Sequence, residues 1–232
     1  MKYELARLGV PSDSITDAGI PVDPAFMNRK DRGELRRAHG LKATSPVILL
    51  MAGWSFRASA VERMIDHLSM VDGDFQLIVL AGRNRELYER VKAKQSREPR
   101  IASVFEFIDF VEDLMRLSDI LISKPGGITT AESLAAGLPM IVVDPIPGQE
   151  EANSDYILEN GAGLKARSLE GLVFKIGRLV ADPARLAYMR ENIGKIARPD
   201  AAFSIADGIA RSLSPTSKGA SAQSQKAFMD EE

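Results

Sequence analysis

A run of glycine and hydroxyl residues near the middle of the 232-residue chain has the composition of a phosphate-binding loop. It follows a short apolar run and opens a helical pattern. Glycines let backbone N–H groups approach a phosphate closely, and the dipole of the helix favours the negative charge. We expect four of its residues to lie close to a phosphate group, against the alternative of a tight turn with a threonine N-cap. They are Gly126, Gly127, Thr129 and Thr130.

The acidic residue that ends this run has two interpretations. Glu132 is predicted within about the first turn of the helix, where a carboxylate complements the dipole. Its oxygens are equally able to accept hydrogen bonds from a ribose diol. The residues alone leave both interpretations open.

Two other loops carry groups suited to a sugar or a phosphate. After the apolar run at 140–143, Gln149 and Glu150 offer donors and acceptors for sugar hydroxyls, or form a solvated first turn of a helix. After the run at 47–51, Ser55 is a further candidate for the diphosphate, while Trp54 is equally suited to pack over the edge of a sheet.

Six apolar runs are predicted as strands, and amphipathic helical patterns separate them. Continuous apolar strands that alternate with helices are typical of a parallel sheet covered on both faces. With right-handed crossovers, the predicted fold is α/β, a Rossmann-like doubly wound sheet followed by extra C-terminal helices. Such sheets bind ligands beyond the carboxyl ends of their strands, where the candidate loops lie. The runs cover 47–51, 75–81, 101–105, 119–122, 140–143 and 162–165.

Three zones are predicted along the chain. Residues 1–45 form an N-terminal segment with a helix, and residues 46–213 form the patterned domain. Residues 214–232 are too polar to bury a core and are expected to be disordered. The basic stretch at 29–37 contains acidic residues and therefore favours a solvated helix face over contact with acidic lipid headgroups.

The composition excludes several classes of protein. With 30 Lys+Arg and 32 Asp+Glu, the net charge of −2 argues against a protein that coats nucleic acid. The absence of cysteine excludes disulfides, thiolate catalysis and cysteine-based zinc sites, and two histidines argue against a multi-histidine metal site. No apolar run approaches the roughly 18 residues that span a bilayer, and the start lacks a signal-peptide pattern, so we expect a cytoplasmic protein.

Other nucleotide and metal motifs are missing or misplaced. Neither a Gly-x-Gly-x-x-Gly nor a P-loop pattern occurs, which disfavours NAD enzymes and P-loop NTPases. The segment Asp72-Gly73-Asp74 has the Asp-x-Asp pattern of one class of metal-dependent sugar transferase. It precedes a predicted strand instead of following one, so we interpret it as a turn.

The order of several segments resembles that of one glycosyltransferase family. The family holds the bacterial diacylglycerol glucosyltransferases, the monogalactosyldiacylglycerol synthases and, more distantly, the MurG N-acetylglucosaminyltransferase. The resemblance covers about residues 3–212. The segments that carry it are Gly-Ile-Pro-Val-Asp-Pro-Ala-Phe at 19–26, Lys-Pro-Gly-Gly-Ile-Thr-Thr-Ala-Glu at 124–132, Ala-Ala-Gly-Leu-Pro at 135–139 and Pro-Ile-Pro-Gly-Gln-Glu at 145–150.

The resemblance implies a two-domain GT-B fold, of which this chain is similar to the C-terminal, donor-binding half. It implies that the glycines and threonines named above meet the diphosphate, and that Glu132 holds the ribose. Gln149 and Glu150 would then read hexose hydroxyls, and Phe107 and Ile108 match the loop whose backbone pairs with uracil. Two positions depart from the family pattern: the loop after the first strand has fewer glycines, and Glu106 replaces a glycine.

The function implied is that of an inverting UDP-sugar-dependent hexosyltransferase that makes glycolipids on a diacylglycerol-type acceptor. No cofactor and no metal are expected besides the donor, because a glycine-rich helix terminus can stabilise the departing diphosphate. The catalytic base and the lipid site are expected in a missing N-terminal half or in a partner chain, so this chain alone should bind UDP or UDP-sugar and transfer sugar poorly.

Three alternatives remain open from the sequence. The chain is otherwise a non-catalytic UDP-sugar-binding module, a subunit of a split transferase, or a UDP-sugar epimerase or hydrolase. The expected partners are UDP-hexose and the lipid acceptor, with no nucleic acid, and peripheral contact with the inner face of the membrane is left open. The sequence does not distinguish between hexoses that differ at one hydroxyl.

Overall fold

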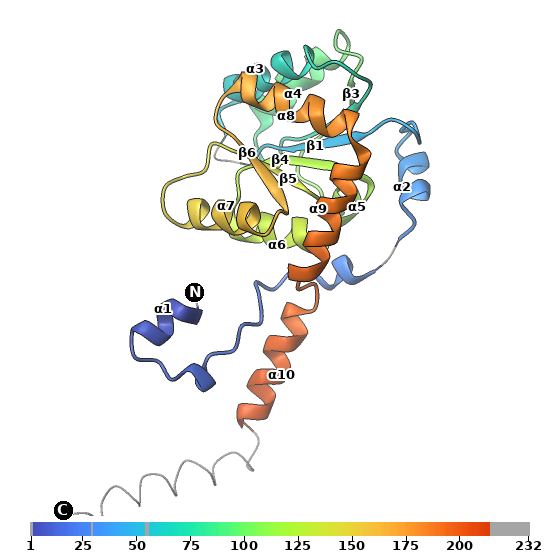
Figure 1. Cartoon of the computed structure of the whole chain (residues 1–232). Helices are drawn as coiled ribbons and strands as arrows, with labels where there is room; N and C mark the ends of the chain where they lie inside the picture. The colour runs from blue at the N-terminus through green and yellow to red at the C-terminus, as the bar shows by residue number, and fades with distance from the viewer. Residues whose placement is uncertain (1, 29, 54–55, 214–232) are drawn as a thin grey trace, which may run out of the picture.

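A six-stranded parallel sheet forms the centre of the molecule, with the strand order β3-β2-β1-β4-β5-β6 (Figure 1). The computed structural model describes residues 2–28, 30–53 and 56–213. The order reverses between β1 and β4, as in a doubly wound sheet, and this confirms the predicted fold class. The strands are β1 (Val47–Met51), β2 (Gln76–Leu80), β3 (Ile101–Phe105), β4 (Ile120–Ser123), β5 (Met140–Val143) and β6 (Gly163–Ala166).

Each predicted apolar run forms one of these strands, and each boundary differs from the prediction by one residue at most. All five residues of β2 are buried, and so are all four of β4 and of β5. Strands covered on both faces need apolar side chains at every position, which is why the runs lack alternation. The apolar pattern therefore predicts the strands closely.

Helices cover both faces of the sheet (Figure 1). Buried side chains of one group pack in a first core above the sheet, and those of the other group pack in a second core below it. The upper helices are α3 (Ala58–Leu68), α4 (Arg85–Gln95) and α8 (Leu169–Ala181). The lower helices are α5 (Val111–Leu117), α6 (Gly127–Ala135) and α7 (Gln149–Glu159).

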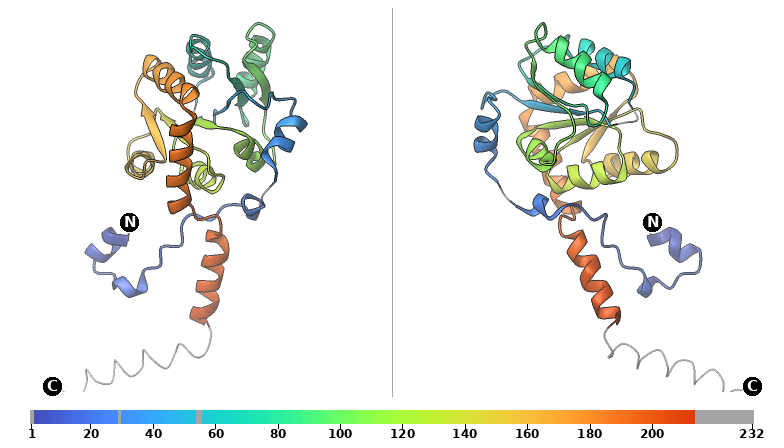
Figure 2. Two further views of the ribbon diagram at one scale, coloured as in Figure 1. Left: turned by 45° about the vertical axis from the view of Figure 1, so that its right-hand side comes forward. Right: turned by 180° about the vertical axis from the view of Figure 1, so that it is seen from behind.

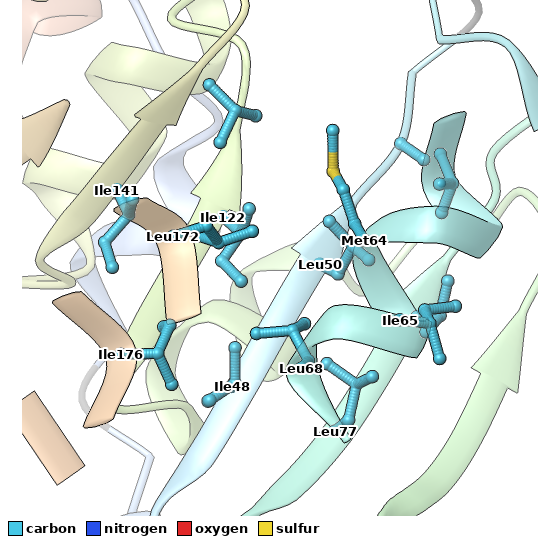
Figure 3. Packing of buried hydrophobic residues seen from close by; sticks show 14 of the residues in the cluster. Ile48, Leu50, Met64, Ile65, Leu68, Leu77, Ile122, Ile141, Leu172 and Ile176 are labelled. Atoms are coloured by element: carbon cyan, nitrogen blue, oxygen red, sulfur yellow. The ribbon is translucent and has the colours of Figure 1, made fainter. Parts of the chain in front are cut away.

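The upper core is built around β1. Figure 3 shows Met64 and Leu68 of α3 above Leu50 and Ile48 of that strand. On the other side of β1, Ile176 of α8 packs into the same cluster. Burying side chains of this size contributes roughly 1.5–3 kcal/mol each relative to exposure, so α3 and α8 are held firmly over the sheet.

The N-terminal segment belongs in part to the lower core. Val22, Phe26 and Leu41 are buried there, the first two around a 3-10 turn at Pro24–Met27. A short helix, α2 (Arg32–Ala38), follows the turn. Part of the segment predicted at 1–45 thus packs against the domain that follows it.

Two helices extend away from the sheet layers (Figures 1 and 2). They are α1 (Lys2–Arg7) and α10 (Ala201–Leu213), and between the sheet and α10 lies α9 (Pro183–Ile196). Within the described ranges, no helix has both the length and the apolar character that a bilayer crossing requires. The tail at 214–232, predicted as disordered, lies outside the described residues.

A buried carboxylate at the amino edge of the sheet ties α2 and α9 to β4. Asp119 receives Arg36 at 2.5 Å, Arg32 at 2.6 Å and Arg190 at 2.8 Å, and the Val47 N–H at 2.8 Å. Burial alone would raise the pKa of this carboxyl, but the guanidinium groups and the backbone N–H together hold the pKa below its usual range.

The interpretation of the basic stretch at 29–37 as a solvated helix face is thus wrong for its two central arginines. Arg36 is only 8% exposed, and the Arg32 guanidinium also donates to the carbonyls of Leu117 and Ser118. Neither side chain is free for a lipid headgroup. The physical reason is the carboxylate of Asp119, more than eighty residues away along the chain.

Candidate functional site

The N-terminus of α6 opens at the carboxyl edge of the sheet, directly after β4. Gly126 is its N-cap and gives no side-chain cap, so the alternative of a threonine N-cap is wrong. The first backbone hydrogen bond of the helix runs from Thr130 N–H to the Gly126 carbonyl, at 2.8 Å. The N–H groups of Gly127, Ile128 and Thr129 thus have no partner within the helix and are available to an anion.

Space is open at the two glycines. A Cβ added to Gly126 would meet no atom within 4 Å. One added to Gly127 would lie 3.5 Å from Nε2 of Gln149 and 3.4 Å from Cδ1 of Ile20. The structure therefore brings Gln149, predicted to read a sugar, next to Gly127, predicted to meet the diphosphate.

The two threonines differ in their surroundings. Thr129 is half-buried, whereas Thr130 is buried, and its Oγ1 has no hydrogen-bond partner among the described residues. The backbone N–H of Thr130 is already used in the helix. Because α6 begins at Gly127, Thr130 is the fourth residue of the helix, and it falls on the inner face. Of the pair, Thr129 is placed for contact with a ligand.

Two hydrogen bonds tie the first turns of α7 to neighbouring loops. Glu150 accepts a hydrogen bond from the Ile146 N–H at 2.8 Å, and Asn153 donates to the Pro125 carbonyl at 2.8 Å. The second bond joins α7 to the loop that precedes α6. Gln149 is exposed at the start of α7, so its amide is free to turn toward a bound group.

Glu132 is a half-buried carboxyl with a raised pKa. Burial is the main cause, and the nearby charges of Asp23 and Glu112 add to it, so the pKa rises to about 7. Glu132 is the sixth residue of α6, beyond the first turn, and the interpretation as a partner of the helix dipole is wrong. The carboxyl is poised to accept hydroxyl donors, which would stabilise its charged form.

The predicted uracil loop follows β3, the outermost strand. Phe107 is 64% exposed, with the Arg83 guanidinium 5.0 Å from the centre of its ring. Ile108 packs against the lower core. Glu106, at the position where a glycine was expected, forms an ion pair with Arg85 at 2.9 Å. The loop leads into α5. The charge of Glu112 on this helix helps to raise the pKa of Glu132, so the predicted uracil loop and Glu132 lie on the same side of the sheet.

A cavity of about 530 Å³ lies at the same edge, on the side of α3 and α8. Sequence reasoning missed its charged residues. Lys124 forms an ion pair with Asp144 at 2.9 Å, and its ammonium lies 5.2 Å from the centre of the Phe56 ring. The signal was present in the sequence, because Lys124 and Asp144 each stand directly after a strand.

Two predictions about this region have different outcomes. Ser55, proposed for the diphosphate, and Trp54 beside it lie outside the described residues. Asp72-Gly73-Asp74 forms a bend before β2, with Gly73 at φ +108°, as the prediction of a turn required. Across the described residues, no group of three or more acidic or histidine side chains is placed to hold a metal ion.

Comparison with protein families shows what this arrangement belongs to. Residues 31–198 match the family described as glycosyl transferases group 1. A curated relative, the processive diacylglycerol beta-glucosyltransferase of Bacillus cereus (strain AH187), is 30% identical over 209 residues. The match covers 90% of this chain and 54% of the relative, so the chain spans about half the length of the curated relatives it matches.

Solved structures share the fold at low identity. Anabaena Alr3699/HepE in complex with UDP-glucose superposes with a TM-score of 0.64 and 17% identity, over 91% of this chain and 60% of that one. A UDP-GlcNAc 2-epimerase from Neisseria meningitidis bound to UDP-GlcNAc has a TM-score of 0.66 and 17% identity, over 90% of this chain and 58% of that one. Both are evidence for the same architecture.

Proposed function

The chain belongs to the glycosyl transferases group 1 family, and on that premise we propose that it is the donor-binding half of an inverting UDP-hexosyltransferase that makes glycolipids. The acceptor is of the diacylglycerol type, as in the name of the curated relative. The observation that carries the proposal is the proximity of two helix starts: a Cβ added to Gly127, at the start of α6, would lie 3.5 Å from Nε2 of Gln149, at the start of α7.

The geometry supports a division of roles along the edge. The free N–H groups at the start of α6 face the diphosphate, and Gly126 leaves room for it to approach. Negative charge grows on this diphosphate as the bond to the sugar breaks, and fixed N–H dipoles stabilise that charge without the help of a metal. Thr129 supplies a hydroxyl beside them.

Recognition of the rest of the donor falls to the flanking residues. Gln149 reads hexose hydroxyls, and Glu150 shapes the loop through its hydrogen bond to Ile146. Glu132 accepts from the ribose hydroxyls, and the backbone at Phe107 and Ile108 pairs with the uracil. The hydrogen bond from Asn153 to Pro125 keeps the sugar and diphosphate loops at a constant separation.

We propose that the general base and the lipid site lie outside this chain, which spans 54% of the curated relative. We therefore expect donor binding without efficient transfer from this polypeptide alone. We assign the protein to the cytoplasm, working at the inner face of the membrane, where a diacylglycerol-type acceptor is reached.

Calorimetric titration of the whole chain with UDP, UDP-glucose and UDP-galactose tests the proposal. Gln149→Ala should weaken binding of the preferred UDP-sugar about tenfold and leave UDP unchanged, because the lost hydrogen bonds reach only the hexose. Glu151→Ala, at the exposed neighbouring position on α7, is the matched control and should change neither.

Three results would contradict the proposal. The first is a native chain that binds neither UDP nor a UDP-sugar. The second is conversion of the UDP-sugar into its epimer without any acceptor, which would favour the epimerase alternative suggested by the shared fold. The third is robust glycolipid synthesis by this chain alone, which would place the base and acceptor site within these residues.

A further inference from the structure

The cavity on the side of α3 and α8 has a strong excess of positive charge. Three cationic side chains line it, Arg57, Arg63 and Lys124, against the single carboxylate of Asp144. Its remaining wall includes the buried side chains of Phe56 and Met64. A volume of about 530 Å³ lies within the range of small-molecule sites, and an apolar wall with a few convergent charges is typical of them.

Lys124 is held away from water. Its side chain is 11% exposed, its ammonium contacts the face of Phe56, and Asp144 is its ion-pair partner. A buried ammonium needs an anion beside it, because desolvation otherwise costs several kcal/mol. A negatively charged group must therefore lie beside the Lys124 ammonium whether or not a ligand is bound.

Asp144 is an unusual choice for that partner. Its side chain is 76% exposed. Its φ of +44° makes it the only non-glycine residue with a positive φ in the described part of the chain. Aspartate and asparagine tolerate such a φ better than other non-glycine residues do. An exposed carboxylate gains little from an ion pair and loses little when it gives up the contact, so this ion pair is easily exchanged.

The two arginines of the cavity are unmatched. In the portion that the structure describes, no carboxylate lies within 4.0 Å of the guanidinium of Arg57 or Arg63. A second groove, of about 370 Å³ between α3 and α4, gives the contrast. There Arg90 pairs with Glu62 at 2.9 Å, and Lys94 pairs with Asp66. Two of the three cations that line that groove thus have a carboxylate partner, whereas in the first cavity only Lys124 has one among the described residues.

We infer that this cavity receives a phosphoryl group of the ligand, whose oxygens replace the Asp144 carboxylate on the Lys124 ammonium. The inference rests on the proposed function, because the diphosphate of a UDP-sugar is the phosphoryl source that reaches this edge. Lys124 stands two residues before Gly126, so one diphosphate can contact both the ammonium and the N–H groups of α6. In the absence of the ligand, the Asp144 carboxylate is the anion that pairs with Lys124.

The exchange also links the two halves of the donor site. Asp144 opens the loop that carries Gln149 and Glu150. When a phosphoryl group pairs with the Lys124 ammonium, Asp144, the first residue of this loop, loses its ion-pair partner. Binding of the diphosphate thus changes the conformational freedom of the loop that leads to the residues proposed to bind the sugar.

Titration of the whole chain at low salt with UDP, uridine and inorganic pyrophosphate tests the inference. Lys124→Met should lower the affinity for UDP and pyrophosphate at least about tenfold, since a charge-assisted hydrogen bond is lost, and leave uridine unchanged. Lys124→Arg should retain most of the affinity. Asp144→Asn should raise the affinity for UDP about threefold or more, because asparagine tolerates a positive φ but does not compete as an anion.

Lys92→Met is the matched control, since Lys92 on α4 contacts only the amide of Gln95 among the described side chains. It should leave all three ligands unaffected. Equal UDP affinity in native chain and Lys124→Met, or an equal loss for uridine and UDP, would overturn the inference and leave the proposed function intact. A fall in UDP affinity with Asp144→Asn would overturn the exchange.

The two proposals fail in different ways. A native chain that binds pyrophosphate through Lys124 but does not bind UDP would contradict the proposed function and support the anion site. Thermal melting of each variant separates lost binding from lost folding. If Lys124→Met does not fold, Arg63→Met carries the test, and an unchanged affinity for both UDP and pyrophosphate in that variant would overturn the inference.

Discussion

The two edges of the sheet treat charge in opposite ways. At the amino edge, Asp119 is buried and receives three guanidinium groups and a backbone N–H. At the carboxyl edge, the N–H groups of α6 have no partner within the helix, and Glu132 faces two other carboxylates. There the ion-pair partner of Lys124 is an exposed aspartate.

The difference separates stability from binding. Polar groups that are fully satisfied hold elements together and have nothing left to offer a ligand. Polar groups that lack a good partner lower the free energy of unfolding, and a ligand that pairs with them raises it again. Substitutions at the amino edge should therefore change folding alone, and those at the carboxyl edge should change folding and ligand affinity in opposite directions.

The largest effect is expected at Asp119. Asp119→Ala leaves the buried Arg36 guanidinium without its anion, and breaking a buried pair in this way costs about 3–5 kcal/mol. Chemical denaturation should show this loss, while the UDP affinity of the folded fraction stays unchanged. Asp66→Ala, which removes an exposed ion pair on α3, should cost less than about 1 kcal/mol. A loss at Asp119 as small as that of the control would remove the distinction between the edges.

Glu132→Gln should change the free energy of unfolding by less than Asp119→Ala does, and it should increase it. The pKa of Glu132 is raised from 4.5 to about 7, so the folded chain binds this proton more tightly than the unfolded chain does. The native free energy of unfolding therefore falls as the pH rises from about 4.5 to 7 and is level above that range. After allowance for solvent screening, the variant should be about 1–2 kcal/mol more stable at pH 8.

Urea denaturation at pH 5 and pH 8 measures this gain, and titration with UDP measures its expected counterpart, a weaker affinity through loss of the ribose acceptor. Glu159→Gln, an exposed substitution at the end of α7, is the control. A variant that is less stable than the native chain at pH 8 would show that the Glu132 carboxylate has favourable partners in the protein without ligand.

The smallest effect on folding is expected at Gly126. Its φ of −59° and ψ of 151° suit alanine, and a Cβ would meet no atom within 4 Å. Gly126→Ala should therefore gain about 0.4–1 kcal/mol through the unfolded state. Its methyl group would occupy the approach of the diphosphate, and we expect the affinity for UDP to fall about tenfold.

Gly208→Ala on α10 has the same open space and should gain stability without any change in UDP affinity. Unaltered UDP binding by Gly126→Ala would sharpen the comparison in another direction. It would move the phosphate contacts away from the start of α6 and toward Lys124.

The architecture followed from local signals. The strands β1 to β6 are apolar at nearly every position, and a glycine ends α6 at residue 137, with φ +69°. Both signals act within a few residues, so they can be read along the chain. Because Gly126, Gly127 and Gln149 follow β4 and β5, the same signals put them at the carboxyl edge of the sheet.

Features that depend on distant partners could not be predicted in this way. Arg32 and Arg36 have the spacing of a solvated helix face, and only the fold brings Asp119 against them. The raised pKa of Glu132 needs Asp23 and Glu112, which come from separate segments. The start of α6 at Gly127, with Gly126 as its N-cap in place of a threonine, leaves Thr130 buried.

The strand order has a kinetic consequence. β1 pairs with β2 and also with β4, and Ile48 and Ile120, which face each other across the second pairing, are roughly 70 residues apart along the chain. Closing a loop of that length is entropically costly and must come after the shorter β1-β2 and β4-β5 closures. We therefore expect the two half-sheets to form first and to join late, along the seam where Asp119 accepts the Val47 N–H. The residues that anchor the finished fold are thus expected to act after the rate-limiting step of folding, slowing the return to the unfolded chain.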